Sequence, residues 1–380
     1  MALNIIVYMI HKNEALRAVK AIRSAQEADM VYVFDTGSTE EQIEKLNDNN
    51  EYFEYGELTV SPWRYDVARN AALALIPGDV DVCVALDSDE VLAPGWRQEI
   101  EAHWVKGETT IMRYMYDWSK GVTFMQAKIH ARSGYQWINP CHEFLEWYGT
   151  GPECYAGTDK FLMFHHPDDT KPRANYLPLL KLGFKERPHD HRMAYYYGRE
   201  LYLASNRPEL KQGYKEPLRA LATKVLYRTI EMKELEKNRA EVSYCWRVIG
   251  QMNDDEGAFK KSIEELPTHR EPYIWYADWL YYQGRFEEAH DQVAIALGIK
   301  NRANDYTVEY RCWDGYPYHL LSWCTHHMGF KEMSIEGAEE ALRLEPDNED
   351  YKKALEYFRN GTLESLPMGV AKVEEEVKGT

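Results

Sequence analysis

Through the first 190 residues, short apolar runs alternate with amphipathic segments. The apolar runs have the length and β-branched content of buried strands, and they occur at residues 4–10, 30–35 and 80–87. Apolar residues at helical spacing occur at residues 14–28, 39–48, 65–76 and 95–104. Three further strands are predicted, at residues 109–118, 123–132 and 160–166. Strands that alternate with helices are typical of an α/β fold with a mostly parallel sheet, here continued by a more mixed region.

Beyond residue 190 the pattern becomes helical, and it contains a repeat. Residues 270–299 carry small residues and an aromatic at positions typical of a helix-hairpin repeat of about 34 residues, namely Ala277, Gly284, Phe286, Ala289 and Ala296. Residues 318–348 carry three matching positions, namely Gly329, Ala341 and Pro346. We interpret this region as an all-α, tetratricopeptide-like domain, with residues 193–204 as a more degenerate first unit. A helical bundle without a repeat is the alternative.

The two better repeat units are separated by an insertion. The distance from Gly284 to Gly329 is longer than one repeat of about 34 residues, and the extra segment is aromatic. The sequence therefore divides into three parts. Residues 1–188 form the α/β domain, residues 189–362 form the tetratricopeptide-like domain, and residues 363–380 form a charged tail that is predicted to be flexible.

Composition narrows the class of protein. The chain has 380 residues, enough for two domains, and its 44% hydrophobic and 28% charged residues are those of an ordinary globular protein. No apolar run reaches the roughly 20 residues that span a bilayer, and the N-terminus is predicted to be a strand and not a signal peptide. The six cysteines form no metal-like pattern, which fits a reducing cytoplasm. A net charge of −17 argues against general nucleic-acid binding but allows a local basic groove.

The stretch VALDSDEVL, residues 84–92, ends a predicted strand and places three carboxylates close together: Asp87, Asp89 and Glu90. Like charges at this spacing repel one another and cost desolvation energy unless something compensates them. Ligands of open α/β sheets bind beyond the carboxyl ends of the strands, and Asp35 ends an earlier predicted strand. We therefore predict that the carboxylates share Mg²⁺ or Mn²⁺ with the phosphates of a nucleoside diphosphate.

Two other interpretations of this stretch stay open. One is a solvated loop that binds no ion. The other is a phosphatase of the haloacid-dehalogenase type, which also has Asp-x-Asp after an apolar strand. Its nucleophile usually lies on the first strand, however, and here at least two strand–helix units precede Asp87. A calcium-binding EF-hand is excluded, because the required Gly and the later Glu are not at their offsets.

Five blocks stand in order along the chain: MIHKNEA (9–15), DTGST (35–39), WRYDVARNAAL (63–73), ALDSDEVL (85–92) and YQWINPCHEFLE (135–146). Together they resemble the family 2 glycosyltransferases with a GT-A fold, and most of all the branch that carries tetratricopeptide repeats after the catalytic domain. The resemblance spans roughly residues 3–360. It implies a Rossmann-like, nucleotide-sugar-binding domain and an inverting transfer of a sugar from a nucleoside diphosphate donor. A UDP-sugar and Mn²⁺ or Mg²⁺ are the expected donor and metal.

The resemblance also implies roles for individual residues. Those expected to bind the donor are Ile10, Asn13, Glu14, Asp35, Thr36, Gly37, Arg69, Asn70, Asp87 and Ser88. Within this set, Asp35 is expected to accept a hydrogen bond from the base. Arg69 is expected to meet the diphosphate with its planar fork, and a structural ion pair is the alternative. Asp87 and Asp89 are the expected metal carboxylates, while Glu90 is expected to anchor the loop through backbone donors.

Direct displacement at the anomeric carbon requires a base near the acceptor hydroxyl or thiol. In the family, the segment matching YQWINPCHEFLE supplies acceptor-side residues, and we predict Glu143 as the base with His142 beside it. A structural His–Glu turn is the competing interpretation. The family usually has Gly before this region, where this chain has Ile-Asn-Pro at 138–140. A third metal ligand is expected at the end of the last predicted strand, where the sequence does not choose between His165 and His166.

The acceptor is expected to be a macromolecule. Helical repeats present a concave surface, so we favour a polypeptide, with the aromatic insertion at 306–318 facing a groove that leads to the Asp-x-Asp pair. The alternative acceptor is a hydroxymethylated pyrimidine in phage DNA. A basic series between the domains would suit it, namely Lys171, Arg173, Lys181, Lys185 and Arg187. An inactive scaffold that holds a partner is the alternative of a different class, and the repeats are also candidates for dimerisation.

Overall fold

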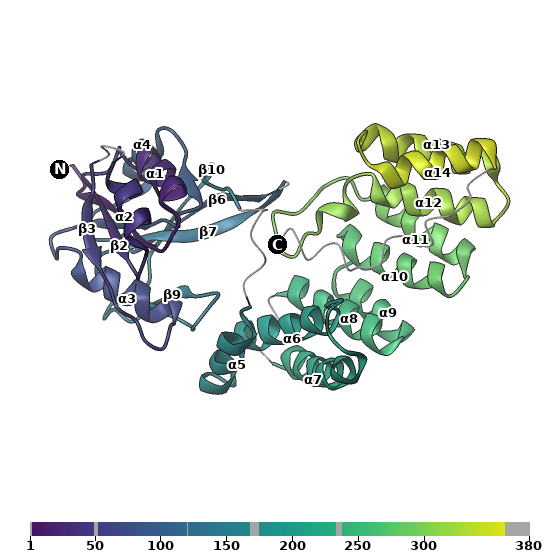
Figure 1. Cartoon of the computed structure of the whole chain (residues 1–380), viewed down its shortest axis with the longest axis horizontal. Helices are drawn as coiled ribbons and strands as arrows, with labels where there is room; N and C mark the ends of the chain where they lie inside the picture. The colour runs from purple at the N-terminus through teal and green to yellow at the C-terminus, as the bar shows by residue number, and fades with distance from the viewer. Residues whose placement is uncertain (1, 49–51, 120, 168–174, 233–237, 362–380) are drawn as a thin grey trace. The chain divides into compact units, whose positions relative to one another are not determined.

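A computed structural model of the chain describes residues 2–48, 52–119, 121–167, 175–232 and 238–361. The chain divides into two compact units, Met1–Gly183 and Phe184–Thr380 (Figure 1). This division falls within helix α5 (Leu177–Glu186), a few residues before the boundary at 188/189 drawn from the sequence. The tail at 363–380 lies outside the described residues.

The first unit is an α/β fold with a mixed sheet, as the alternation of strands and helices predicts. The sheet has eight strands in the order β3-β2-β1-β4-β7-β6-β10-β5. Its strands are β1 (Ile5–His11), β2 (Met30–Asp35), β3 (Glu54–Glu57), β4 (Val82–Ala85), β5 (Glu90–Leu92), β6 (Ile111–Ser119), β7 (Val122–Ala131) and β10 (Tyr155–His165). Parallel pairs join β3, β2, β1 and β4, and also β6 and β10. Strand β7 is antiparallel to both β4 and β6, and β5 is antiparallel to β10.

Both faces of the sheet are covered. The covering helices are α1 (Ala15–Ser24), α2 (Glu40–Asn47), α3 (Tyr65–Leu75) and α4 (Trp96–His103), and a separate antiparallel ribbon is formed by β8 (Tyr135–Ile138) and β9 (Phe144–Trp147). Val19 of α1, Leu46 of α2 and Trp96 of α4 pack into one apolar core. Leu73 of α3 and Trp137 of β8 pack into a second core. Because each face of the sheet is buried, the strand register is strongly specified, and this fixes the positions of the strand ends.

The strand ends bring distant parts of the sequence to one edge of the sheet. In the parallel pair β1–β2, His11 is opposite Asp35, so both strands end together. Strand β4 runs parallel to β1 and is followed by Asp87. Strand β10 ends at His165 and pairs with β5, which begins at Glu90. The predicted acidic residues and one predicted histidine therefore share the carboxyl edge of the parallel strands, where open α/β sheets bind ligands.

The second unit is all helical in its described residues, as predicted. Its helices are α6 (His191–Ser205), α7 (Gln212–Ile230), α8 (Arg239–Asn253), α9 (Glu256–Glu265), α10 (Arg270–Tyr282), α11 (Phe286–Gly298), α12 (Tyr316–His327), α13 (Lys331–Leu344) and α14 (Glu349–Asn360), with the short 3₁₀ helix η2 (Tyr310–Cys312). Successive helices pack in pairs, from α6 with α7 to α12 with α13, and α14 packs on α13. Among the helices that the structure describes, none combines the length and the apolarity needed to cross a membrane.

The small residues that indicated a repeat have the expected structural roles. Gly284 and Gly329 adopt φ values of +74° and +84° in the turns after α10 and α12, a conformation that favours glycine. Ala277, Ala289 and Ala341 are fully buried. Their size allows paired helices to approach closely, so the repeat interpretation agrees with the packing.

The aromatic insertion packs on helices of its own unit. Its predicted orientation toward a groove that leads to the Asp-x-Asp pair stays a prediction. The Tyr306 hydroxyl donates to Glu241 of α8. The Trp313 indole and the Glu309 backbone N–H donate to Glu271 Oε1 of α10, at 2.8 and 3.1 Å. Buried indole and phenol groups need hydrogen-bond partners, and carboxylates on α8 and α10 supply them.

Candidate functional site

The loop after β4 carries the three predicted carboxylates, and Glu90 anchors it. Glu90 Oε2 accepts a hydrogen bond from the Asp87 backbone N–H at 2.8 Å, and its Oε1 accepts from the Tyr116 hydroxyl at 2.6 Å. The Glu90 side chain is 1% exposed, whereas that of Asp89 is 33% exposed. The anchoring role predicted for Glu90 is therefore observed, and Asp89 is the most accessible of the three carboxylates.

Two cations of the protein itself compensate Asp87 and Glu90. Arg69 Nη2 lies 2.5 Å from Asp87 Oδ1. Lys128 Nζ lies 2.7 Å from Asp87 Oδ2 and 2.6 Å from Glu90 Oε1. Asp87 and Glu90 therefore have counter-charges within the protein, and the predicted metal ion stays a prediction. Lys128 comes from β7, and nothing in the sequence indicates that β7 inserts next to β4 in the sheet.

Burial and ion pairing together set the protonation states of this cluster. Burial opposes ionisation of Asp87, but the charges of Arg69 and Lys128 outweigh it and hold the pKa of Asp87 below its usual value. Burial would also lower the pKa of Lys128, but Asp87 and Glu90 outweigh it and raise this pKa. Burial raises the pKa of Glu90, and the charge of Lys128 offsets this only in part. The Asp87–Lys128 pair is therefore ionised on both sides at neutral pH.

Asp89 has a different partner, His165 at the end of β10. His165 Nε2 lies 3.2 Å from Asp89 Oδ2, and His165 Nδ1 lies 2.9 Å from the Trp118 carbonyl oxygen. Because a carbonyl oxygen can only accept, Nδ1 carries a hydrogen and donates it. The imidazole also stacks on the Trp118 ring, with centroids 4.1 Å apart. His166 is exposed and reaches Asp89 only through its backbone N–H, which donates to the Asp89 carbonyl at 2.7 Å.

The Asp89–His165 pair has the donor set of a partial metal site. A carboxylate oxygen and an imidazole whose other nitrogen is held by a carbonyl are typical ligands of divalent transition metals such as Mn²⁺. Although burial lowers the pKa of His165, the hydrogen bond and charge of Asp89 raise it overall, so a proton and a cation would compete for Nε2. Within the described residues, no group of three or more His, Cys, Asp or Glu side chains could hold a metal ion. A cation at this pair would take its other ligands from a substrate or from water.

Arg69 links the carboxylate loop to the predicted base. Arg69 lies on α3, and its Nε donates to Glu143 Oε1 at 2.6 Å. Its guanidinium carbon lies 4.8 Å from the centroid of the Trp137 ring, and its side chain is 6% exposed. The alternative prediction for Arg69, an ion pair within the protein, describes what the structure shows. The Arg69 guanidinium donates to both Asp87 and Glu143, so it positions these two carboxylates.

Asn70 fixes the same helix to the β8–β9 ribbon. Its Nδ2 donates to the Trp137 carbonyl at 2.7 Å, and its Oδ1 accepts from the Trp137 N–H at 2.8 Å. Both ends of the amide are therefore used in holding α3 against β8. The predicted contact with ribose would require Asn70 to exchange one of these bonds.

The loop between β8 and β9 carries Glu143 and His142, and two of its residues have positive φ values. Asn139 has φ +80° and His142 has φ +50°. These values lie in the left-handed region that glycine adopts most readily, and Asn is among the few other residues that enter it routinely. Asn139 thus adopts a backbone conformation that glycine most often provides. The His142 ring lies 5.6 Å from the ring of Tyr176.

The residues predicted to form the base pocket lie at the ends of β1 and β2. Asp35 Oδ2 accepts from the backbone N–H groups of Gly37 and Ser38 at 2.9 and 2.8 Å. The Thr36 N–H and hydroxyl donate to the His11 carbonyl at 2.8 and 3.0 Å. Gly37 has φ +109°, which only glycine tolerates well. The Asp35 carboxylate therefore shapes its own turn, in addition to any contact with a base.

The remaining predicted donor residues flank a histidine that the sequence did not single out. Ile10 and Glu14 are half-buried, and Asn13 has φ +55° between β1 and α1. His11 is 2% exposed, with its Nδ1 3.5 Å from Ser88 Oγ. Its Nε2 is buried and has no hydrogen-bond partner within the described residues. Burial lowers the pKa of His11, so a neutral imidazole stands between the end of β1 and the carboxylate loop.

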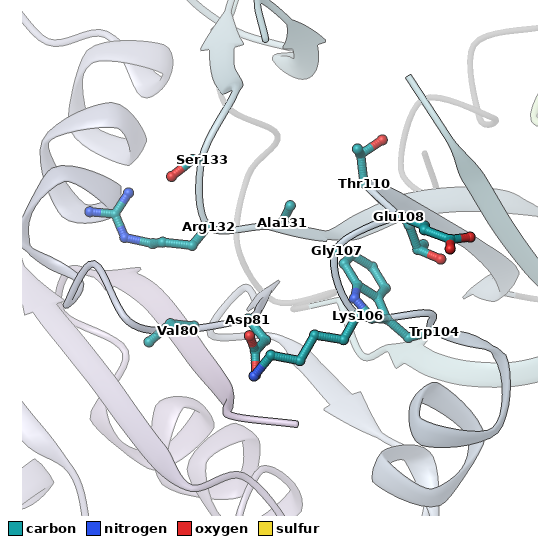
Figure 2. Close-up of a pocket in the computed structure, with 11 residues that line it drawn as sticks. Val80, Asp81, Trp104, Lys106, Gly107, Glu108, Thr110, Ala131, Arg132 and Ser133 are labelled. Carbon is teal, nitrogen blue, oxygen red and sulfur yellow. The ribbon is translucent and has the colours of Figure 1, made fainter. Parts of the chain in front are cut away.

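A separate cavity of about 250 Å³ lies at the opposite edge of the sheet (Figure 2). Its lining includes residues that precede β4 and β6 and follow β7. Within it, Lys106 Nζ lies 2.7 Å from Asp81 Oδ2, and Arg132 donates to the Ile76 carbonyl at 2.7 Å, just after α3. The site residues predicted from the sequence, all of which the structure describes, do not line this cavity. Asp81, Lys106 and Arg132 already have structural partners, so the candidate site remains the carboxylate edge.

Comparisons with known proteins add little beyond these observations. No protein-family model and no curated protein matches the chain. Among solved structures, TarS of S. aureus is matched with a TM-score of 0.36 and 10% identity, over 96% of this chain and 56% of that one. MamA is matched with a TM-score of 0.33 and 14% identity, over 47% of this chain and 88% of that one. TTC0263, a tetratricopeptide repeat protein of Thermus thermophilus, is matched with a TM-score of 0.33 and 15% identity, over 47% of this chain and 88% of that one.

Proposed function

We propose that this chain is a glycosyltransferase that takes a sugar from a nucleoside diphosphate donor at the carboxyl edge of its sheet. The observation that carries the proposal is the meeting of three elements at this edge. Asp35 ends β2, the Asp87–Asp89 loop follows β4, and His165 ends β10 and contacts Asp89. The five ordered sequence blocks that resemble family 2 glycosyltransferases contribute most of these residues.

The donor side of the proposal rests on the strand ends. The turn after β2, held by Asp35, would form one wall of a base pocket, and the end of β1 at Ile10 and His11 would form its floor. The neutral His11 imidazole has a buried Nε2 that could accept from or donate to the nucleotide, depending on its tautomer. A UDP-sugar is the donor that we expect.

The diphosphate of the donor would bind beside Asp89 and His165. Their carboxylate and imidazole groups fit Mn²⁺ better than Mg²⁺, because imidazole suits softer divalent ions than Mg²⁺. When bound, such an ion supplies positive charge against the developing charge of the leaving diphosphate. Asp89 and His165 would hold it, and the Trp118 carbonyl and ring would keep the imidazole in the required tautomer and orientation.

Transfer would proceed by direct displacement, with inversion at the anomeric carbon. The acceptor oxygen or sulfur forms a bond to that carbon as the bond to the diphosphate oxygen breaks, and the electron pair leaves with the diphosphate. Glu143 would take the acceptor proton. Its Oε1 is held by Arg69 Nε, so Oε2 is the oxygen that would accept the proton. Arg69 would orient Glu143 and Asp87 together and would not contact the diphosphate.

The acceptor that we favour is a polypeptide. The second unit consists of paired helices of the kind that bind proteins in many repeat arrays. Its insertion already covers parts of α8 and α10, so an acceptor would use other surfaces of the repeats. The formal charge of −17 disfavours a polyanionic acceptor outside a local basic groove.

The decisive experiment is a thermal-shift screen of nucleotide sugars. Each UDP-, GDP- and CMP-sugar is added to the whole protein with Mn²⁺ or with a chelator. A ligand at 100 times its dissociation constant stabilises the folded state by about 2.7 kcal/mol, which a melting curve resolves readily. We expect one donor class to raise the unfolding temperature only when Mn²⁺ is present, and to be hydrolysed slowly in its presence. A protein that no nucleotide sugar stabilises would be a scaffold without this activity.

A further inference from the structure

The ammonium group of Lys128 lies between two carboxylates at the centre of the candidate site. Lys128 Nζ is 2.7 Å from Asp87 Oδ2 and 2.6 Å from Glu90 Oε1. The Lys128 side chain is 12% exposed and that of Glu90 is 1% exposed. Two carboxylates that converge on one point from different positions of a loop are the arrangement that hard cations bind. Here the Lys128 ammonium group, which is part of the chain, occupies the position between the two carboxylates.

We propose that Lys128 is a built-in counter-ion that keeps Asp87 and Glu90 from binding an exchangeable metal ion. Among the described residues of this sheet edge, the side chains left to bind a divalent cation are then those of Asp89 and His165. Lys128 is then a positioning residue, since it acts through the carboxylates and not on a substrate. The inference deepens the proposed function, and the role of the Asp89–His165 pair in transfer rests on that function.

The strand that carries Lys128 has an irregular register next to this residue. Lys128 belongs to β7, and the ladder between β6 and β7 shifts register near it, where Met112 is opposite Ile129 but Tyr114 is opposite Gln126. An extra residue in one strand re-aims the side chains around it, and such bulges are common next to functional sites. Lys128 lies within this shifted segment, and its side chain reaches Asp87 and Glu90.

The neighbouring groups also reduce the freedom of the two carboxylates. The Tyr116 hydroxyl donates to the same Glu90 oxygen that Lys128 contacts, at 2.6 Å. Arg69 holds the other oxygen of Asp87 at 2.5 Å. Each Asp87 oxygen therefore has a cationic partner. A divalent ion at Asp87 would be repelled by both Lys128 and Arg69 unless it displaced one of them.

The balance of charge explains why Asp89, unlike Asp87 and Glu90, remains available to a metal ion. Asp87, Glu90 and Glu143 carry three negative charges against the two positive charges of Arg69 and Lys128. Among the described residues, Asp89 forms no ion pair with either cation, and its partner is His165. The cluster is thus nearly balanced without a metal ion, and Asp89 is the carboxylate left to attract one.

The test measures Mn²⁺ binding by electron paramagnetic resonance, on the full chain and without any nucleotide sugar. In the otherwise unaltered protein, Asp89→Asn should weaken Mn²⁺ binding by about tenfold or more, because the ion loses a ligand, and tenfold corresponds to about 1.4 kcal/mol. Asp87→Asn should change the binding by less than about twofold. Loss of binding in Asp87→Asn as large as in Asp89→Asn would overturn the inference, because Asp87 would then be a metal ligand.

A second arm removes the ammonium group. Lys128→Met should gain a new Mn²⁺ site at Asp87 and Glu90, seen as tighter binding by about tenfold and as an unfolding temperature that rises with Mn²⁺. The gain should vanish when Asp87→Asn is added. The matched control is Lys160→Met, which removes an exposed lysine that pairs with Glu99 and should change neither readout. If Lys128→Met does not fold, Lys128→Gln replaces it, because the amide retains donors for both carboxylates.

A structural lysine alone would give lower stability without any gain of Mn²⁺ binding, so a Lys128→Met or Lys128→Gln protein that is indifferent to Mn²⁺ contradicts the inference. Because no donor is present, the result is independent of the proposed reaction. A protein with this Mn²⁺ pattern but no donor turnover would retain the inference and lose the proposed function.

Discussion

Arg69 Nε donates to Glu143 Oε1 across 2.6 Å, and this contact joins α3 to the loop between β8 and β9. The same guanidinium holds Asp87 through Nη2. The predicted base and the first carboxylate after β4 are therefore placed by one buried side chain. Any change in Arg69 is expected to act on both sides of the reaction that we propose.

Arg69→Met should destabilise the fold strongly. It leaves the Asp87 and Glu143 carboxylates without their buried partner, and removing one member of a buried ion pair costs about 3–5 kcal/mol. The measurement is urea unfolding of the full chain, followed by tryptophan fluorescence. The matched control is Arg343→Met, which breaks a surface pair with Glu340 and should cost at most about 1 kcal/mol. Equal losses in the two variants would show that Arg69 contributes no more than a surface arginine.

Glu143→Gln should remove most sugar transfer and spare donor binding. The amide oxygen can still accept from Arg69 Nε, so the loop keeps its position, but it cannot take a proton at neutral pH. General base catalysis contributes about 10²–10⁴-fold, and kcat should fall by that factor with little change in the donor dissociation constant. Near-normal transfer by Glu143→Gln would assign the base to another residue, with His142 the next to test.

Asp89→Asn should abolish metal-dependent donor turnover while the unfolding temperature without metal stays nearly the same. A neutral amide is a poor ligand for a hard cation, and Asp89 is 33% exposed, so little stability depends on it. Donor hydrolysis is measured across an Mn²⁺ titration. Asp159→Asn, an exposed carboxylate on the same strand as His165, is the matched control. Full activity of the unaltered protein in a chelator would remove the metal from the proposed mechanism.

The sequence predicts the central strands because their signals are local. The runs at 4–10, 30–35 and 80–87 are apolar, β-branched and bounded by helical patterns, and they become β1, β2 and β4. Strand β3 contains Glu54, Tyr55, Gly56 and Glu57, a composition without an apolar run, and β5 has only three residues. These edge strands exist because of pairing with β2 and β10, and no local pattern reports such pairing.

The sequence predicts many residues of the candidate site but few of the contacts between them. Asp87, Asp89, Arg69, Glu143 and His165 were all selected from the sequence, and the structure joins them in two groups. Lys128 was missed because its importance depends on β7 inserting between β4 and β6. The available signal was a lysine inside a predicted strand, because burying its charge is costly unless it pairs with a carboxylate.

Asn139→Gly should keep the fold and the activity, whereas Asn139→Ala should destabilise. The φ of +80° costs a residue with a Cβ about 1–2 kcal/mol, and glycine avoids this cost. Both polar atoms of the Asn139 amide are buried with no hydrogen-bond partner within the described residues, so glycine loses no such hydrogen bond there. Urea unfolding of the two variants gives the difference. A Gly variant that is the less stable of the two would show that the left-handed conformation of residue 139 does not limit the stability of this loop.

The acceptor can be identified by the salt dependence of transfer. If the acceptor is hydroxymethylated DNA, the basic series between the domains should bind phosphates. Of this series, Lys181 and Lys185 are exposed on α5, and Arg187 forms an ion pair with Asp190 at 3.3 Å. Lys171 and Arg173 lie outside the described residues.

Five phosphate contacts would weaken DNA binding by a few hundred-fold between about 50 and 200 mM salt, because each neutralised phosphate releases counterions. We expect instead that labelled sugar is transferred to polypeptide with modest salt dependence, since a net charge of −17 disfavours DNA as a partner. The double variant Lys181→Glu/Lys185→Glu separates the cases, with Lys352→Glu/Lys353→Glu on α14 as the matched control. Only DNA transfer should depend on the first pair. Transfer to DNA alone, lost at the higher salt and in the first variant only, would make modified DNA the acceptor and leave the helical unit with another role.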